Sequence, residues 1–140
     1  DFITVTQAVD LDQMETDIAA ALGSSGGTIT GDLTLGAGTF VNYSVTAGIT
    51  ASTTQTQGEG ALVSGVNEVS TVANANDTVT LPAAVAGRQC VVINNGANTL
   101  QIFPAADDAI NDGAVDASTT AAAGDNILFI AFNSVIWEAC

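Results

Sequence analysis

The sequence predicts a mainly β protein in which residues 51–140 fold as an antiparallel β-sandwich, jelly-roll-like in its cadence. Short apolar segments recur in this part every ~8–12 residues and are separated by turns rich in Gly, Asn and Asp, a spacing typical of sandwich strands. Pro82 and Pro104 fall at the ends of such segments, where a missing N–H breaks no ladder of hydrogen bonds. Ahead of the sandwich we expect a short helix and an extended β arm.

Runs of apolar and β-branched residues locate the strands of the predicted sandwich. The segment 126–132 is apolar on both faces, so we expect one face in the core and the other against a neighbouring subunit. Residues 105–113 are rich in Asp and predict a turn. The expected strands cover 62–64, 66–73, 77–82, 89–94, 99–104, 114–120, 125–132 and 135–138.

The segments 89–94 and 99–104 are expected to form a hairpin at the centre of the sandwich. Asn95-Gly96 stands between them, and this dipeptide favours a type I′ turn because both residues tolerate the positive φ that the turn requires. The two strands should therefore pair with each other, and Gly96 should have a positive φ.

A single helix is predicted, over residues 10–22. Asp10 is a suitable N-cap and Gly23 a suitable stop. A helix of ~13 residues is marginal by itself in water, so its apolar stripe has to dock on something. It could dock on the sandwich of its own chain, or it could form a short parallel bundle with sister subunits, because part of the stripe has coiled-coil spacing. The stripe consists of Leu11, Met14, Ile18 and Leu22.

Residues 1–23 are expected to hold a short N-terminal strand over 2–6 and the helix, and the segment 24–50 is expected to be an extended, intertwined β arm between them and the sandwich. A short strand is predicted over 40–45. The apolar residues earlier in the arm are too few to bury a face within one chain, which favours association with the arms of other subunits. Together with the helical stripe, the residues expected at the oligomer interface are Ile29, Leu33 and Leu35.

The charge of the chain excludes several partners and several kinds of chemistry. Fifteen acids face one base, Arg88, which gives a formal net charge of −14. Nucleic acid and anionic membrane surfaces require clustered Lys and Arg, so both are excluded as partners. The chain has no His, so it offers no Ser-His-Asp or Cys-His arrangement and no usual zinc ligand set. We therefore expect no enzymatic activity and no cofactor.

Arg88 and the cysteines are expected to be structural. Arg88 should form a salt bridge, buried or between subunits, with one of the many acids. Cys90 alternates with Val92 in a predicted strand and should pack as a small apolar residue. A disulfide between Cys90 and Cys140 is neither required nor excluded by the sequence.

The acidic loop 107–113 holds the best candidates for a cation site, because Ca²⁺ prefers carboxylate and amide oxygens in a bent loop. The spacing of an EF-hand fails, since Thr119 stands where Glu is required. Asp and Asn are also ordinary turn residues, so a solvated turn is the favoured interpretation and metal the weaker one. The metal candidates are Asp107, Asp108, Asn111 and Asp112.

Several phrases of the sequence resemble proteins of tailed-bacteriophage particles. GITA (48–51) and the run over 66–112, followed by a closing strand pair that ends in Trp137, are similar to a β-sandwich module of virion proteins. GGTITGDLTL (26–35) is similar to a phrase common in phage fibre proteins, where the chains of a trimer wrap around a threefold axis. The resemblance implies a place on the outside of the particle, and it brings no catalytic or binding residue with it.

The resemblance, the size and the charge together favour a non-enzymatic structural protein on the outer surface of the virion. The first expectation is a homotrimeric capsid decoration (cement) protein, bound to the major capsid protein or to other virion proteins. The alternative is a tail-fibre or head-fibre protein for receptor binding and adhesion, whose partner could be a glycan of the host surface. Trp137 and Tyr43 could stack on a sugar, although lone aromatics in strand patterns more often pack in a core or an interface.

Overall fold

The computed structural model describes residues 41–140, which form one compact unit of strands joined by turns and bends. The helix expected over 10–22 and most of the arm lie outside the described residues. The unit confirms a mainly β fold with two sheets. Its strands are β1 (Val45–Thr50), β2 (Val66–Thr71), β3 (Asp77–Thr80), β4 (Gln89–Asn94), β5 (Leu100–Phe103), β6 (Ala109–Ile110), β7 (Thr119–Ala121), β8 (Asn126–Ala131) and β9 (Ile136–Ala139).

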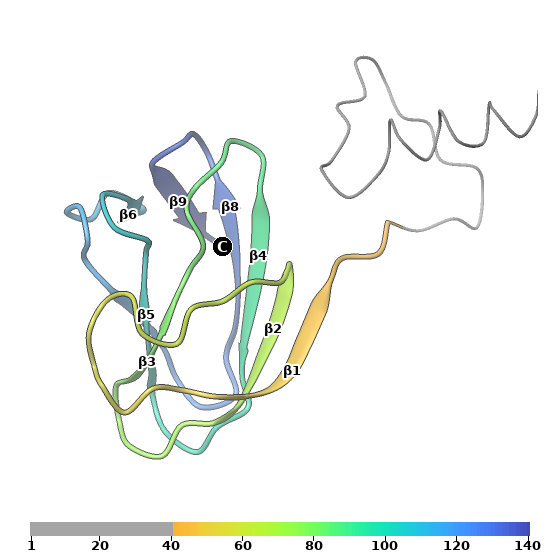
Figure 1. Ribbon diagram of the computed structural model, residues 1–140, viewed down its shortest axis with the longest axis vertical. Coiled ribbons are helices and arrows are strands. Elements are labelled where there is room, and N and C mark those ends of the chain that lie inside the picture. The colour runs from red at the N-terminus through yellow and green to blue at the C-terminus, as the bar shows by residue number, and fades with distance from the viewer. Residues whose placement is uncertain (1–40) are drawn as a thin grey trace, which may run out of the picture. The chain divides into compact units, whose positions relative to one another are not determined.

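From β2 to β5, consecutive strands alternate between the two sheets, so the chain winds as a coil. β2 and β4 belong to a six-stranded sheet, whereas β3 and β5 belong to a three-stranded sheet. β1, β2 and β4 run parallel to one another, and their paired residues stand 20, 21 or 25 positions apart, as in Ile49↔Val69, Val45↔Val66 and Val66↔Val91. The arrangement is β-solenoid-like, with successive coils of the chain side by side (Figure 1).

The last part of the chain closes this coil with antiparallel strands. β8 lies antiparallel to both β4 and β9, and β7 lies antiparallel to β5. The order of the larger sheet is β1-β2-β4-β8-β9-β6, and the order of the smaller sheet is β3-β5-β7. β1 is thus an edge strand of the larger sheet, and this sheet takes in part of the segment 24–50 that the sequence assigns to the arm.

The expected antiparallel order is wrong for more than half of the strand pairing. Four of the seven ladders are parallel, namely β1·β2, β2·β4, β3·β5 and β6·β9. Parallel neighbours in a sheet need a crossover connection, and the chain makes such crossovers through the other sheet between β2 and β4 and between β3 and β5. Alternation of apolar residues does not reveal this, because side chains alternate across both parallel and antiparallel strands.

The hairpin expected around Asn95-Gly96 is also wrong. β4 and β5 belong to different sheets, and Gly96 is not among the residues with positive φ. The segment between these strands forms a corner that lies on the corner of the preceding coil. Asn95 N donates to Val69 O at 2.9 Å, and a Cβ built on Gly96 would stand 2.5 Å from Cγ2 of Val72. Glycine is required here by a close approach of two corners and not by backbone conformation.

The remaining strand predictions differ from the structure mainly at the ends of the strands. No strand covers 62–64, although Ala61 forms an isolated bridge, and the strand expected over 40–45 starts only at the last residue of that range. Of 114–120 only the end is a strand, and the turn expected over 105–113 contains β6. The expected segments that do contain a strand are 66–73, 77–82, 89–94, 99–104, 125–132 and 135–138.

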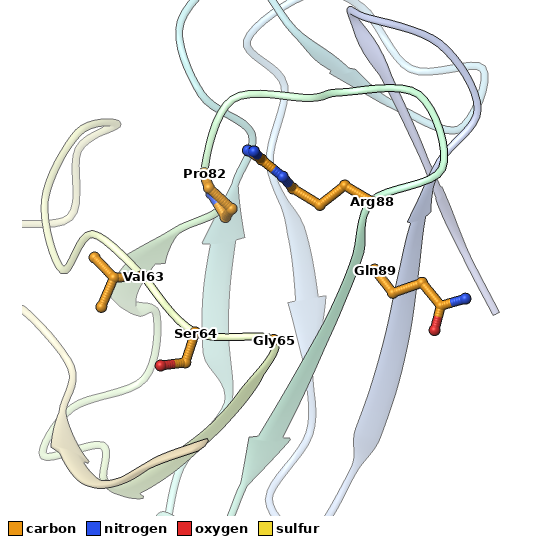
Figure 2. A pocket seen from close by; sticks show the side chains of 6 residues that line it. All are labelled: Val63, Ser64, Gly65, Pro82, Arg88 and Gln89. Atoms are coloured by element: carbon orange, nitrogen blue, oxygen red, sulfur yellow. The ribbon is translucent and has the colours of Figure 1, made fainter. Parts of the chain in front are cut away.

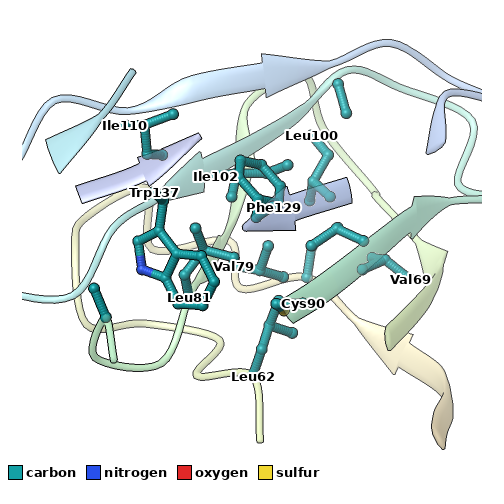
Figure 3. Close-up of a cluster of buried hydrophobic side chains, with 14 of the residues drawn as sticks. Leu62, Val69, Val79, Leu81, Cys90, Leu100, Ile102, Ile110, Phe129 and Trp137 are labelled. Atoms are coloured by element: carbon teal, nitrogen blue, oxygen red, sulfur yellow. The ribbon is translucent and has the colours of Figure 1, made fainter. Parts of the chain in front are cut away.

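One hydrophobic core lies between the two sheets (Figure 3). Trp137 and Phe129 are its largest side chains, and neither has any exposed surface. Val92 from the larger sheet and Leu100 and Ile102 from the smaller one are equally buried. Burial of each such side chain stabilises the fold by ~1.5–3 kcal/mol relative to exposure. The core therefore holds the coils and the closing strands together as one unit.

Candidate functional site

A pocket of about 250 Å³ lies where the loop before β2 meets the start of β4. Figure 2 shows the Arg88 side chain reaching from the start of β4 toward Pro82, with Val63 and Ser64 on the opposite side. Pockets for drug-sized ligands measure ~300–1,000 Å³, so this one suits a single side chain or a small polar group. It is lined by Val63, Ser64, Gly65, Pro82, Arg88 and Gln89.

Arg88, the one base of the chain, is exposed at this pocket. Its Nη1 donates to Ala83 O at 2.8 Å, which is the side-chain hydrogen bond that Arg88 makes within residues 41–140. The backbone is held as well, because Ala131 N donates to Arg88 O at 2.8 Å. The buried form of the expected salt bridge is therefore wrong, and a salt bridge between subunits stays a prediction.

Cys90 packs in the core as expected, and both Cys90 and the exposed Cys140 are free thiols. Burial raises the pKa of the Cys90 thiol to about 11, against the smaller opposing effects of an Asn67 hydrogen bond and the charge of Arg88. Asn67 Nδ2 donates to Cys90 Sγ at 3.4 Å. A thiol that stays protonated at neutral pH is a weak nucleophile, so Cys90 serves in packing.

The acidic loop uses its side chains to hold the backbone. The buried carboxylate of Asp108 accepts a hydrogen bond from Ala84 N at 2.8 Å, and Asn111 Oδ1 accepts one from Ala139 N at 2.8 Å. Asp107 and Asn111 have positive φ angles of 69° and 53°, which Asp and Asn tolerate better than most residues. These contacts support the interpretation of the loop as a turn.

Residues 41–140 contain no group of three or more His, Cys, Asp or Glu side chains that could hold a metal ion. Asp116 Oδ1 accepts hydrogen bonds from Asp107 N and from Gln57 Nε2, both at 2.9 Å, so it ties the loop to the long connection before β2. Asp112 is exposed. In this part of the chain, the structure does not bring together as a ligand set the metal candidates Asp107, Asp108, Asn111 and Asp112.

The carboxylates of Asp77 and Glu68 have lowered pKa values because backbone N–H groups donate to them. Asn74 N donates to Asp77 Oδ2 at 2.8 Å, which lowers the pKa of Asp77. Gly48 N donates to Glu68 Oε2 at 2.7 Å, and this bond, together with one from the Asn95 side chain, lowers the pKa of Glu68. Both carboxylates hold irregular backbone in place, since Gly48 has a positive φ of 75° within β1 and Asn76, between Asn74 and Asp77, has a φ of 69°.

The two aromatic residues considered for sugar stacking have different surroundings. Trp137 has no exposed surface and packs in the core near Leu81, so the stacking hypothesis is wrong for this ring (Figure 3). Its buried Nε1 has no hydrogen-bond partner among residues 41–140. Tyr43 is 52% exposed and lies over Gly65, where an added Cβ would stand 3.1 Å from Tyr43 Cβ. Only Tyr43 is available to an external ligand.

Two buried asparagines were missed by the reasoning from sequence. Asn94 Nδ2 donates to the carbonyls of Asn98 and Ala121, both at 3.0 Å, and Asn67 Nδ2 donates to Ser64 O at 2.7 Å. A buried amide stabilises a fold when its hydrogen bonds are made, and these bonds join strands to the adjacent loops. Both residues stand at inward positions of their strands, which alternation alone could have revealed.

The oligomer interface predicted from sequence lies outside the described residues. It consists of Leu11, Met14, Ile18, Leu22, Ile29, Leu33 and Leu35.

In the described part of the chain, no helix has the length and apolar character needed to cross a membrane.

Comparison of the chain with protein-family models, with curated proteins and with solved structures gave no match. The resemblance to virion modules therefore rests on the phrases of the sequence quoted above.

Proposed function

We propose that the protein is a non-enzymatic structural protein on the outer surface of a tailed-bacteriophage particle, and that it acts as a trimeric decoration (cement) protein of the head. The proposal rests on the surroundings of the carboxylate and thiol groups among the described residues. The carboxylates of Asp77 and Asp108 accept backbone N–H groups, and the thiol of Cys90 is buried. Such an arrangement supports a rigid building block better than it supports catalysis.

The mechanism of a decoration protein is mass action. Its contacts exist only on the assembled shell, so binding stabilises the assembled state relative to free subunits by RT ln(1 + [L]/Kd), which is ~2.7 kcal/mol per site at a concentration of 100 Kd. The charge of −14 keeps free copies soluble and apart. Trimer formation then needs short-range apolar contacts, and we assign these to the apolar residues of the helical stripe and the arm within 1–45.

A fibre protein for receptor binding is the second candidate, and the coiled topology favours it. Parallel pairing at offsets of 20, 21 or 25 residues is a repeat that further chain can extend along one axis. β1 is the edge at which such an extension would continue. We also propose that residues 41–140 are related to the jelly-roll-like sandwich of virion proteins and differ from it in the coiled path of the chain. In this alternative, the exposed Tyr43 would contact a host glycan.

Electron microscopy of phage particles labelled with a gold-conjugated antibody against residues 41–140 tests the proposal. Label spread over the head supports decoration, and label confined to fibres supports the second candidate. Antibody that has been saturated with purified protein is the control and should leave the particles bare. If intact particles carry no label while lysates of infected cells contain the protein, both candidates are refuted.

A further inference from the structure

The outward side of the larger sheet carries an apolar row that crosses four strands. Val45, Val66, Val91 and Leu128 are successive partners in register on β1, β2, β4 and β8. One adjacent outward position on each of β4 and β8 is apolar as well, Ile93 and Ile130, whereas the other outward positions hold Gln89 and Asn126. We define the outer apolar face as the side chains of Val45, Val66, Val91, Ile93, Leu128 and Ile130.

These side chains point away from the core. Cys90 and Phe129, which alternate with them along β4 and β8, have no exposed surface, whereas Val91 and Leu128 are only half-buried and Val45 is 66% exposed. A sheet with one face on a core and the other in water is expected to be polar on the watery side. A contiguous apolar face of this kind is typical of an interaction surface.

The charge distribution indicates what kind of partner fits. The chain has fifteen acids, yet on the strands β1, β2, β4, β8 and β9 there are two, Glu68 opposite Ile93 and the exposed Glu138 opposite Ile130. The Glu68 carboxylate is already engaged, since Gly48 N and Asn95 Nδ2 donate to it at 2.7 and 3.1 Å. Two copies of so acidic a chain repel each other least where acids are fewest. This face therefore suits a like-charged partner unusually well.

We propose that the outer apolar face packs against a second copy of this chain, an inference that rests on the trimer of the proposed function. Four strands ~4.8 Å apart and about six residues long at ~3.3 Å per residue cover roughly 400 Å². A standard interface buries ~800 Å² on each partner, so this face forms about half of one. The apolar residues before Val45 supply the remaining contacts, and loss of the face weakens the oligomer without abolishing it.

Sedimentation equilibrium of the full chain in ~0.15 M salt, where long-range repulsion is largely screened, tests this proposal. Val91→Glu places a charge at the centre of the face and should weaken self-association about tenfold or more. Val115→Glu is the matched control, because Val115 is 58% exposed, lies off the face, and gives the same change in net charge. It should alter self-association by no more than about twofold.

Thermal melts of the dilute variants show whether Val91→Glu still folds. If it does not, Val91→Thr replaces it as the test, since Thr keeps the shape and strand propensity of Val and should weaken association about threefold or more. If the wild type forms an oligomer and the Val91 variants associate as tightly as the Val115→Glu control, the inference is overturned. The proposed function would still stand in that case. A full-length chain that is monomeric at every concentration would overturn both the inference and the trimer.

Discussion

Gly96 provides the sharpest test of how successive coils pack. Its φ lies outside the positive range, but an added Cβ would stand 2.5 Å from Val72 Cγ2 and 2.7 Å from Val72 N. Gly124 is the opposite case, with a φ of +87° and nothing within 4 Å of an added Cβ. Asn tolerates positive φ better than most residues but needs room for its side chain. We therefore compare Gly96→Asn with Gly124→Asn.

The structure predicts different losses of folding stability for these two substitutions. At position 96 the new side chain meets both the side chain and the backbone of Val72, so the corner has to move, and overpacking of this kind destabilises by ~1–3 kcal/mol. About 2 kcal/mol corresponds to a fall in melting temperature of roughly 8–16 °C for a unit of this size. At position 124 the side chain enters open space, and the strain comes only from a positive φ that Asn tolerates better than most residues, so we expect a smaller loss, of about 1 kcal/mol or less.

Thermal unfolding followed by far-ultraviolet circular dichroism measures both variants, and urea unfolding at one temperature gives the corresponding free energies. The midpoints should be compared at one protein concentration, because self-association shifts them. If Gly96→Asn melts as high as Gly124→Asn, the close approach to Val72 is wrong, and with it the stacking of successive coils at this corner. That result would instead favour the hairpin turn that the dipeptide Asn-Gly suggests.

Four further predictions concern titration, reactivity, assembly and activity. Because hydrogen bonds lower the pKa of Asp77, its carboxylate stabilises the fold fully above its unfolded pKa of 3.8 and loses this effect as pH falls through the folded pKa. The stability difference between wild type and Asp77→Asn should therefore shrink on acidification, and a difference that stays constant would contradict the assignment. Iodoacetamide should alkylate exposed Cys140 and spare Cys90 in the folded protein, as mass spectrometry can check, and two modifications before unfolding would show that the core is open there. In sedimentation, a chain that starts at Val41 should associate more weakly than the full chain, and equal association would remove residues 1–40 from the interface. Purified protein should release no reducing sugar from host envelope glycans, and any release would overturn the non-enzymatic function.

The positions of most strands could be predicted from the sequence because the relevant signal is local. The apolar run over 90–93 located β4, and the two-residue period of a strand placed Cys90 on the same side as Val92, in the core. Residues of the acidic loop such as Asp107 and Asn111 were recognised as turn formers for the same reason, since Asp and Asn tolerate the positive φ that they have here. The predictions that the chain is not an enzyme and does not bind nucleic acid also rest on composition alone.

The direction of pairing and the surfaces that result from it were decided only by the tertiary structure. Alternation assigns Val91 to the outward side of its strand, but it does not reveal that Val66 and Leu128 become its neighbours. Asn95-Gly96 predicts a hairpin from local preference, whereas the contact of Gly96 with Val72 joins residues one coil apart. Parallel and antiparallel strands share one alternation pattern, so only the packing of distant segments around a common core distinguishes a coil from an antiparallel sandwich.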